Sequence, residues 1–261
     1  MVFAQKVVCW SNLSNMRIKL FIEYDGTNYV GWQKQNNGKS IQEEIENSLF
    51  KIFEKKIDLF VAGRTDSGVH AKNQVAHFDI DSKINPLKIR SAINFFLKKS
   101  DNRISILDSK EVKNTFHARF SAKKRTYSHK VLNRKSSSPL LKNRMWFIPY
   151  KLDLISMREA ASFLIGTHDF NSFRSTHCQA NSSIRSIKKI AILKKEDIII
   201  FSISAQSFLH NQVRIIVGSL INVGRNYWEK EKILEILEKK DRTFAGPTAP
   251  PFGLYLENID Y

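Results

Sequence analysis

The apolar residues of the chain change their spacing in a fixed order, and this order occurs twice. Between Arg17 and Tyr24 they alternate with other residues, as in a half-buried strand, whereas after the capping box that starts at Ser40 they recur at helical spacing. Pro86 stands at the first position of a second helical stretch. The first half is therefore predicted to run β-α-β-β-α-β, with strands at 17–24, 57–62, 74–80 and 104–112 and helices starting at 41 and 86.

The second half repeats the pattern with one additional helix. We expect strands at 121–132, 145–148, 183–193, 198–205 and 254–259, and helices at 152–165, 209–223 and 229–239. Two such ferredoxin-like units, side by side, would make an α+β protein with one extended, mainly antiparallel sheet, helices on one face and a cleft between the halves. We expect domains at 16–115 and 116–261, after an N-terminal extension at 1–15 whose order the sequence does not set, with Met16 as an alternative start.

The charge of the chain points to a polyanionic partner. There are 42 Lys and Arg against 25 Asp and Glu, which leaves a net charge of +17. Nucleic acid is favoured over an acidic membrane, because no apolar stretch approaches the ~20 residues of a membrane span and no basic amphipathic helix dominates. The loop 133–143 reads as a basic, exposed flap, although charge runs are often merely solvated. Candidate RNA backbone contacts are Lys123, Lys124, Arg125, Arg134 and Lys135.

The cysteines and histidines do not indicate a metal site. Cys9 and Cys178 form no C-x-x-C pair, which favours a reducing compartment and a cytoplasmic protein. His168 and His177 lie near Cys178, but their spacing fits no zinc pattern. We therefore expect neither a metal nor a disulfide framework.

The segment Ala62 to Ala71, AGRTDSGVHA, is the main candidate for chemistry. Asp66 lies between Gly63 and Gly68, which allow close approach of a ligand, and Arg64 can lower the pKa of the carboxyl group. On spacing alone, an ordinary β-turn would explain the same residues.

Four segments together resemble one family, the tRNA pseudouridine synthases of the A type. They are AGRTDSGVHA at 62–71, KRTYS at 124–128, FLHNQVRIIVG at 208–218 and TAPPFGLYL at 248–256, and the opening FIEYDGTNYVGWQ and the stretch HDFNSFRSTHCQ also match. The resemblance runs from about Arg17 to the C-terminus and excludes the extension before Met16. Ser67 stands where alanine is more usual in the family.

The resemblance implies an isomerase that converts uridines at positions 38, 39 and 40 of the tRNA anticodon arm to pseudouridine, without metal or other cofactor, as a homodimer holding tRNA. It assigns catalysis to Asp66, with Arg214 as its ion-pair partner and Tyr127 stacking on the uracil and assisting proton removal at C5. Arg64 would help to displace the target base, and Leu254 would pack behind it.

Three alternatives for Asp66 stay open in the sequence: attack at C1′, attack at base C6, or removal of the ribose 2′ proton. Two other functions also compete. A non-catalytic RNA-binding protein of the same fold would not need Asp66. A glycosidase-like hydrolase would need a second positioned carboxylate, and none is evident near the loop.

Overall fold

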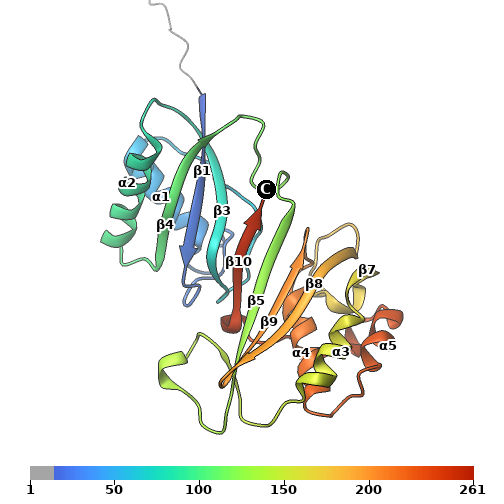
Figure 1. Cartoon of the computed structure of the whole chain (residues 1–261). Helices are drawn as coiled ribbons and strands as arrows, with labels where there is room; N and C mark the ends of the chain where they lie inside the picture. The colour runs from blue at the N-terminus through green and yellow to red at the C-terminus, as the bar shows by residue number, and fades with distance from the viewer. Residues whose placement is uncertain (1–14) are drawn as a thin grey trace, which may run out of the picture.

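One sheet runs through the whole protein and joins its two halves (Figure 1). The computed structural model describes residues 15–261, so the extension before Asn15 and Cys9 lie outside the described residues. The strand order is β4-β1-β3-β10-β5-β9-β8-β7, with β2 paired to β3 and β6 to β5. The predicted α+β fold with an extended, mainly antiparallel sheet is confirmed.

The first half contains the six predicted elements in the predicted order. Ser40 caps the first helix, where its side chain accepts a hydrogen bond from the Glu43 N–H, and Asn85 caps the second. The elements are β1 (Asn15–Tyr24), α1 (Ile41–Phe53), β2 (Phe60–Val61), β3 (His70–Asp81), α2 (Pro86–Lys99) and β4 (Ile104–Val112).

The second half repeats the unit and adds short pieces. Its elements are β5 (Lys124–Asn133), β6 (Trp146–Ile148), α3 (Leu154–Ser162), β7 (Gly166–Asp169), β8 (Ile184–Lys195), β9 (Ile198–Ala205), α4 (Gln212–Gly224), α5 (Lys232–Lys239) and β10 (Leu254–Asp260). The order β10-β5-β9-β8 is that of a ferredoxin-like unit, as is the order β4-β1-β3 with β2 on the far side of β3.

The last strand of the chain forms the seam between the halves. β10 pairs antiparallel with β5 of its own half and parallel with β3 of the other, where Tyr255 lies opposite His70 and Leu256 opposite Ala71 (Figure 1). The start of β3, which directly follows the Asp66 loop, is therefore held against the second half. The seam brings the two sets of candidate residues together.

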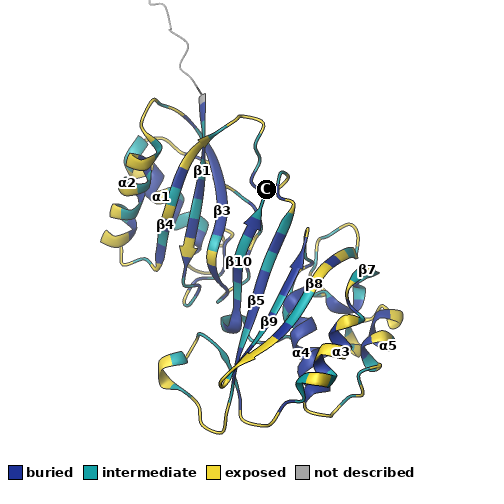
Figure 2. Ribbon diagram, viewed as in Figure 1, coloured by how far each residue is buried: buried dark blue, intermediate teal, exposed yellow. Residues whose placement is uncertain are grey.

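The helices of both halves cover the same face of the sheet. Tyr24, Ala71, Leu256 and Tyr127 pair across four adjacent strands, so they share one face. That face continues into the buried side of β1 beneath α1 and into the side of β5 and β9 beneath α4 (Figure 2). A cavity lined by residues of β5, of β10 and of the loop before β3 lies at the seam.

Several predicted boundaries were wrong. The strand expected at 57–62 is only two residues long, because Ile57 and Leu59 are buried in the core without pairing to a strand. The strand expected at 74–80 starts earlier, at His70, because β10 supplies a partner for its first residues. β7 was not predicted, since its sequence Gly-Thr-His-Asp lacks an apolar alternation.

Candidate active site

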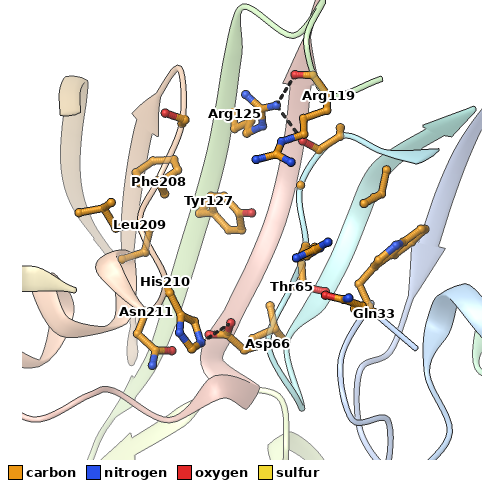
Figure 3. A pocket seen from close by; sticks show the side chains of 18 of the residues that line it. Gln33, Thr65, Asp66, Arg119, Arg125, Tyr127, Phe208, Leu209, His210 and Asn211 are labelled. Atoms are coloured by element: carbon orange, nitrogen blue, oxygen red, sulfur yellow. Dashed lines mark hydrogen bonds and ion pairs between the residues drawn. The ribbon is translucent and has the colours of Figure 1, made fainter. Parts of the chain in front are cut away.

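Asp66 lies in the loop that connects β2 to β3 and faces a cavity between the halves (Figure 3). The cavity has a volume of about 1060 Å³, and its lining comes from both halves of the sheet. The Asp66 side chain is 26% exposed, so the carboxylate is reachable but largely shielded from water. The hydroxyl of Ser67 donates to the Tyr29 carbonyl at 3.0 Å and adds one bond that holds the loop.

The opening stretch of the chain packs against this loop and fixes its path. The Trp32 N–H donates to the Thr65 carbonyl at 3.0 Å, and the Thr65 hydroxyl is hydrogen-bonded to that of Tyr24 at 2.8 Å. A Cβ on Gly26 would lie only 2.0 Å from the Val69 carbonyl oxygen. Glycine is required there because two backbones meet.

Arg214 reaches the carboxylate from α4 in the second half. Its Nη1 donates to Asp66 Oδ2 at 3.0 Å and to Asn211 Oδ1 at 2.8 Å, while its Nε donates to the Ala249 carbonyl at 2.7 Å. The predicted pairing with Asp66 is present in the structure. Three acceptors orient the planar guanidinium, so the charge beside Asp66 is held in one place.

His210 is a second partner of Asp66, and the sequence analysis did not predict it. Its Nε2 lies 3.4 Å from Asp66 Oδ1 (Figure 3). The hydrogen bond to Asp66 raises the pKa of His210. Burial alone would raise the pKa of Asp66, but the His210 hydrogen bond and the Arg214 charge outweigh it and lower that pKa. The carboxylate is therefore ionised at neutral pH. His210 lies just before α4, so helical spacing from Arg214 does not mark it in the sequence.

Tyr127 lies on β5 in the cavity wall, between the Asp66 loop and Phe208 (Figure 3). Its ring packs edge-on against Phe208 with centroids 5.3 Å apart, and a Cβ on Gly63 would be 3.8 Å from its hydroxyl. Burial raises the pKa of Tyr127, so the phenol is neutral at pH 7. Such a group can stack on a base and can donate a hydrogen bond or relay a proton.

Arg64 and Leu254 also line the cavity, as predicted residues of the site. Arg64 is exposed, whereas Leu254 is 5% exposed and belongs to the core. This difference agrees with the roles predicted for them. The exposed Arg64 cation can enter a nucleic acid, whereas the buried apolar side chain of Leu254 can form a pocket wall. Their roles stay predictions.

The five basic residues predicted to contact the RNA backbone do not lie together in the structure. Arg125 lines the cavity, but its guanidinium is buried and donates to three backbone carbonyls, those of Ala62, Arg119 and Gln206. Lys124 pairs with Asp260 at 2.6 Å. Of the predicted contacts, Lys123, Lys124, Arg134 and Lys135 are not among the residues that line the cavity. That any of these five residues contacts RNA stays a prediction. The four that do not line the cavity would contact RNA on the outer surface of the protein.

The described part of the chain was searched for metal-binding groups and for membrane-spanning helices. Within residues 15–261, no three His, Cys, Asp or Glu side chains gather as a metal-binding group. No helix in that range is both long and apolar enough to cross a membrane.

Comparison with known proteins identifies the family. A family model described as tRNA pseudouridine synthase matches residues 20–121 and 160–261, one segment in each half, and the chain belongs to this family. Proteins named tRNA pseudouridine synthase A are similar over almost the whole chain. Those of Anaplasma phagocytophilum and Wolbachia pipientis wMel are 47% and 49% identical, and that of Ehrlichia canis is 46% identical; each alignment covers 94% of this chain and 100% of the relative.

Proposed function

We propose that this protein is a tRNA pseudouridine synthase that isomerises uridines at positions 38, 39 and 40 of the anticodon arm. The observation that carries the proposal is the Asp66 carboxylate, held by Arg214 and His210 in a shared cavity at the seam of the two halves. The family and the names of the relatives agree with this activity. The choice of the anticodon arm rests on the resemblance alone.

The reaction replaces one bond between uracil and ribose with another and transfers one proton. The bond between uracil N1 and ribose C1′ breaks, a bond between C5 and C1′ forms, C5 loses its proton and the rotated ring gains one at N1. Positive character develops at C1′ when the first bond breaks, and a nearby carboxylate can stabilise it or bond to it, as in glycoside hydrolysis. Attack at C6 and removal of the 2′ proton remain alternative tasks for the same oxygen atoms.

The other cavity residues supply binding and orientation. Tyr127 offers its ring face to the uracil and a neutral hydroxyl to the C5 proton, while Leu254 closes the pocket behind the base. Arg64 would occupy the place that the target nucleotide vacates when it leaves the stack. Extrusion costs a few kcal/mol, which phosphate contacts by a protein of net charge +17 would offset.

The proposal includes a homodimer whose subunits hold tRNA together and a cytoplasmic location, both taken from the resemblance. Sedimentation of the free protein and of its tRNA complex tests the dimer. A monomeric mass in both samples would reject it.

One assay tests the activity and separates the alternatives. The protein is incubated with tRNA tritiated at uracil C5, and label release and free uracil are both measured. We expect the wild type to release tritium without uracil, and Asp66→Asn to bind the tRNA but release nothing. Transcripts with cytidine at position 38, 39 or 40 then show which sites are used.

Two results would overturn the proposal. Free uracil would indicate a hydrolase, which the site does not favour because Asp66 is the only carboxylate among the described residues that line the cavity. Binding without tritium release, unchanged in Asp66→Asn, would indicate a non-catalytic RNA-binding protein.

A further inference from the structure

A cluster of aromatic rings lies at one end of the cavity and takes no part in the chemistry described above. It consists of Phe60, His77, His117 and Phe120, and we call it the aromatic rim. The Phe60 ring stacks on His77 with centroids 5.1 Å apart, and the Phe120 ring lies 4.4 Å from that of His117. His77 and His117 join the two pairs at 4.8 Å. Two rings of the rim are open to solvent, since Phe60 is 46% exposed and Phe120 is 76% exposed.

The rim belongs to the cavity that holds Asp66. Phe60, His117 and Phe120 all line it, together with Arg119. In the close view, Arg119 lies at the end opposite the Asp66–His210 pair, and Tyr127 lies between them (Figure 3). A uracil in contact with Tyr127 and Asp66 would therefore leave the aromatic rim free for another group.

Hydrogen bonds hold the rim in place before any ligand arrives. The Ala118 N–H donates to His77 Nδ1 at 3.2 Å, and the Arg119 N–H donates to His117 Nδ1 at 3.1 Å. The Tyr261 hydroxyl donates to the Ala118 carbonyl at 2.8 Å. The segment between β4 and β5 is thus tied to β3 and to the C-terminal residue. Ligand contact with a fixed surface costs little conformational entropy.

The chemistry of the rim suits a flat, uncharged ring. Burial lowers the pKa of His77 to about 4, and burial with the nearby arginines Arg17 and Arg119 lowers that of His117, so both imidazoles are neutral at pH 7. The Arg119 guanidinium lies 5.6 Å from the centre of the Phe120 ring and provides a positive charge beside the rim. Aromatic faces next to a cation are typical of surfaces that bind unpaired nucleotides.

We propose that the aromatic rim is a second nucleobase subsite, in which Phe120 stacks on an unpaired base close in sequence to the target uridine while Arg119 faces its phosphate. The cavity volume of about 1060 Å³ reaches the upper end of ordinary ligand pockets, which leaves room for more than one nucleotide. The proposal rests on the proposed function for the identity of the RNA. It adds a contact that anchors the strand after the target base has been displaced.

The test combines variants of Phe120 with tRNAs that lack one base. Each nucleotide flanking the target uridine is made abasic in turn, and Kd is measured by filter binding for the wild type, Phe120→Ala, Phe120→Leu and Phe120→Trp. Phe95→Ala is the matched control, because Phe95 is 62% exposed on α2 and does not line the cavity. Thermal denaturation verifies the fold of each variant; Phe120 is so exposed that we expect no change.

Stacking predicts a specific set of results. Phe120→Ala and Phe120→Leu should raise Kd by about 5- to 150-fold, the range for loss of one base–aromatic stack, while Phe120→Trp should bind like the wild type. One abasic position should raise the Kd of the wild type by a similar factor and should have no further effect on Phe120→Ala.

Other outcomes reject the subsite. Phe120→Ala that binds like Phe95→Ala would show that the ring makes no contact, and Phe120→Leu that binds like the wild type would show an apolar contact without stacking. Multiplicative effects at every abasic position would show that Phe120 contacts none of these bases. Failure of the proposed function would appear differently, as absence of tritium release by the wild type, and the Kd comparison would still decide on the rim.

Discussion

Replacement of Arg214 by methionine tests how the site controls its carboxylate. Methionine keeps much of the side-chain length but removes the charge and the donors to Asp66, Asn211 and the Ala249 carbonyl. Asp66 then keeps its contact with the His210 imidazole. The variant separates two tasks of Arg214, which are to keep the carboxylate ionised and to hold it in position.

The two tasks have different pH dependences. The Arg214 charge helps to lower the pKa of Asp66, whereas burial acts in the opposite direction, so removal of the charge raises this pKa. The variant should therefore lose activity at a higher pH than the wild type as the solution is acidified. Near pH 8 the carboxylate is ionised in both proteins, because an unperturbed aspartate has a pKa of about 3.9. A loss there, on the order of 100-fold in kcat, would report misplacement of the carboxylate by about 1 Å.

Stability should fall as well. Both side chains are partly exposed, 14% for Arg214 and 26% for Asp66, so solvent screens the pair and we expect a loss of about 2 kcal/mol in the free energy of unfolding. For a chain of this size, that loss corresponds to about 4–8 °C in Tm. Arg158→Met is the control, because it removes a 2.9 Å hydrogen bond to the Ile192 carbonyl and neither residue lines the cavity.

Tritium release measured from about pH 4 to pH 8 distinguishes the two tasks of Arg214, since this range spans the ionisation of a carboxyl group. An acid limb at the same pH as in the wild type, or at a lower pH, would refute the electrostatic role of Arg214. Equal losses in Arg158→Met would show that the effect is general destabilisation.

Three further changes probe the surroundings of the carboxylate. Arg125→Met should lower Tm by about 6–12 °C, because three backbone carbonyls at the seam lose their hydrogen-bond donor at about 1 kcal/mol each. An unchanged Tm would show that Arg125 does not stabilise the contact between the halves. Because the pKa of His210 is raised in the folded state, its contact with Asp66 stabilises the protein fully below pH 6.5, and this contribution is lost as the pH rises through the folded-state pKa. His210→Gln should therefore lower Tm more at pH 6 than at pH 9. Equal shifts in Tm at the two pH values would contradict this. Gly26→Ala, whose Cβ would lie 2.0 Å from the Val69 carbonyl oxygen, should displace the Asp66 loop and reduce tritium release by on the order of 100-fold. Full activity would disprove the close approach of the two backbones.

The amino-acid sequence alone predicted the order of the elements in both β-α-β-β-α-β units, although it missed β7, and it singled out the carboxylate that faces the cavity. Period-two and helical patterns identified both β-α-β-β-α-β units, since each element buries one face and local spacing records it. The family resemblance, carried by the motif around Asp66 and by the FLHNQVR segment, implied that Asp66 and Arg214 would meet, and their side chains do meet at 3.0 Å. The domain division at residue 115 and the predicted roles of Tyr127 and Arg64 stay predictions.

Only the tertiary structure decided which residues surround that carboxylate. β10, at the end of the chain, pairs in parallel with the start of β3, and no local pattern records a contact between strands so far apart in the sequence. This pairing lengthens β3 and brings the Asp66 loop against α4, which places His210 beside the carboxylate. The same packing gives Arg125 three backbone partners and collects the aromatic rim from β2, β3 and the segment before β5. Such neighbours depend on how the two halves meet, and that is a property of the assembled sheet.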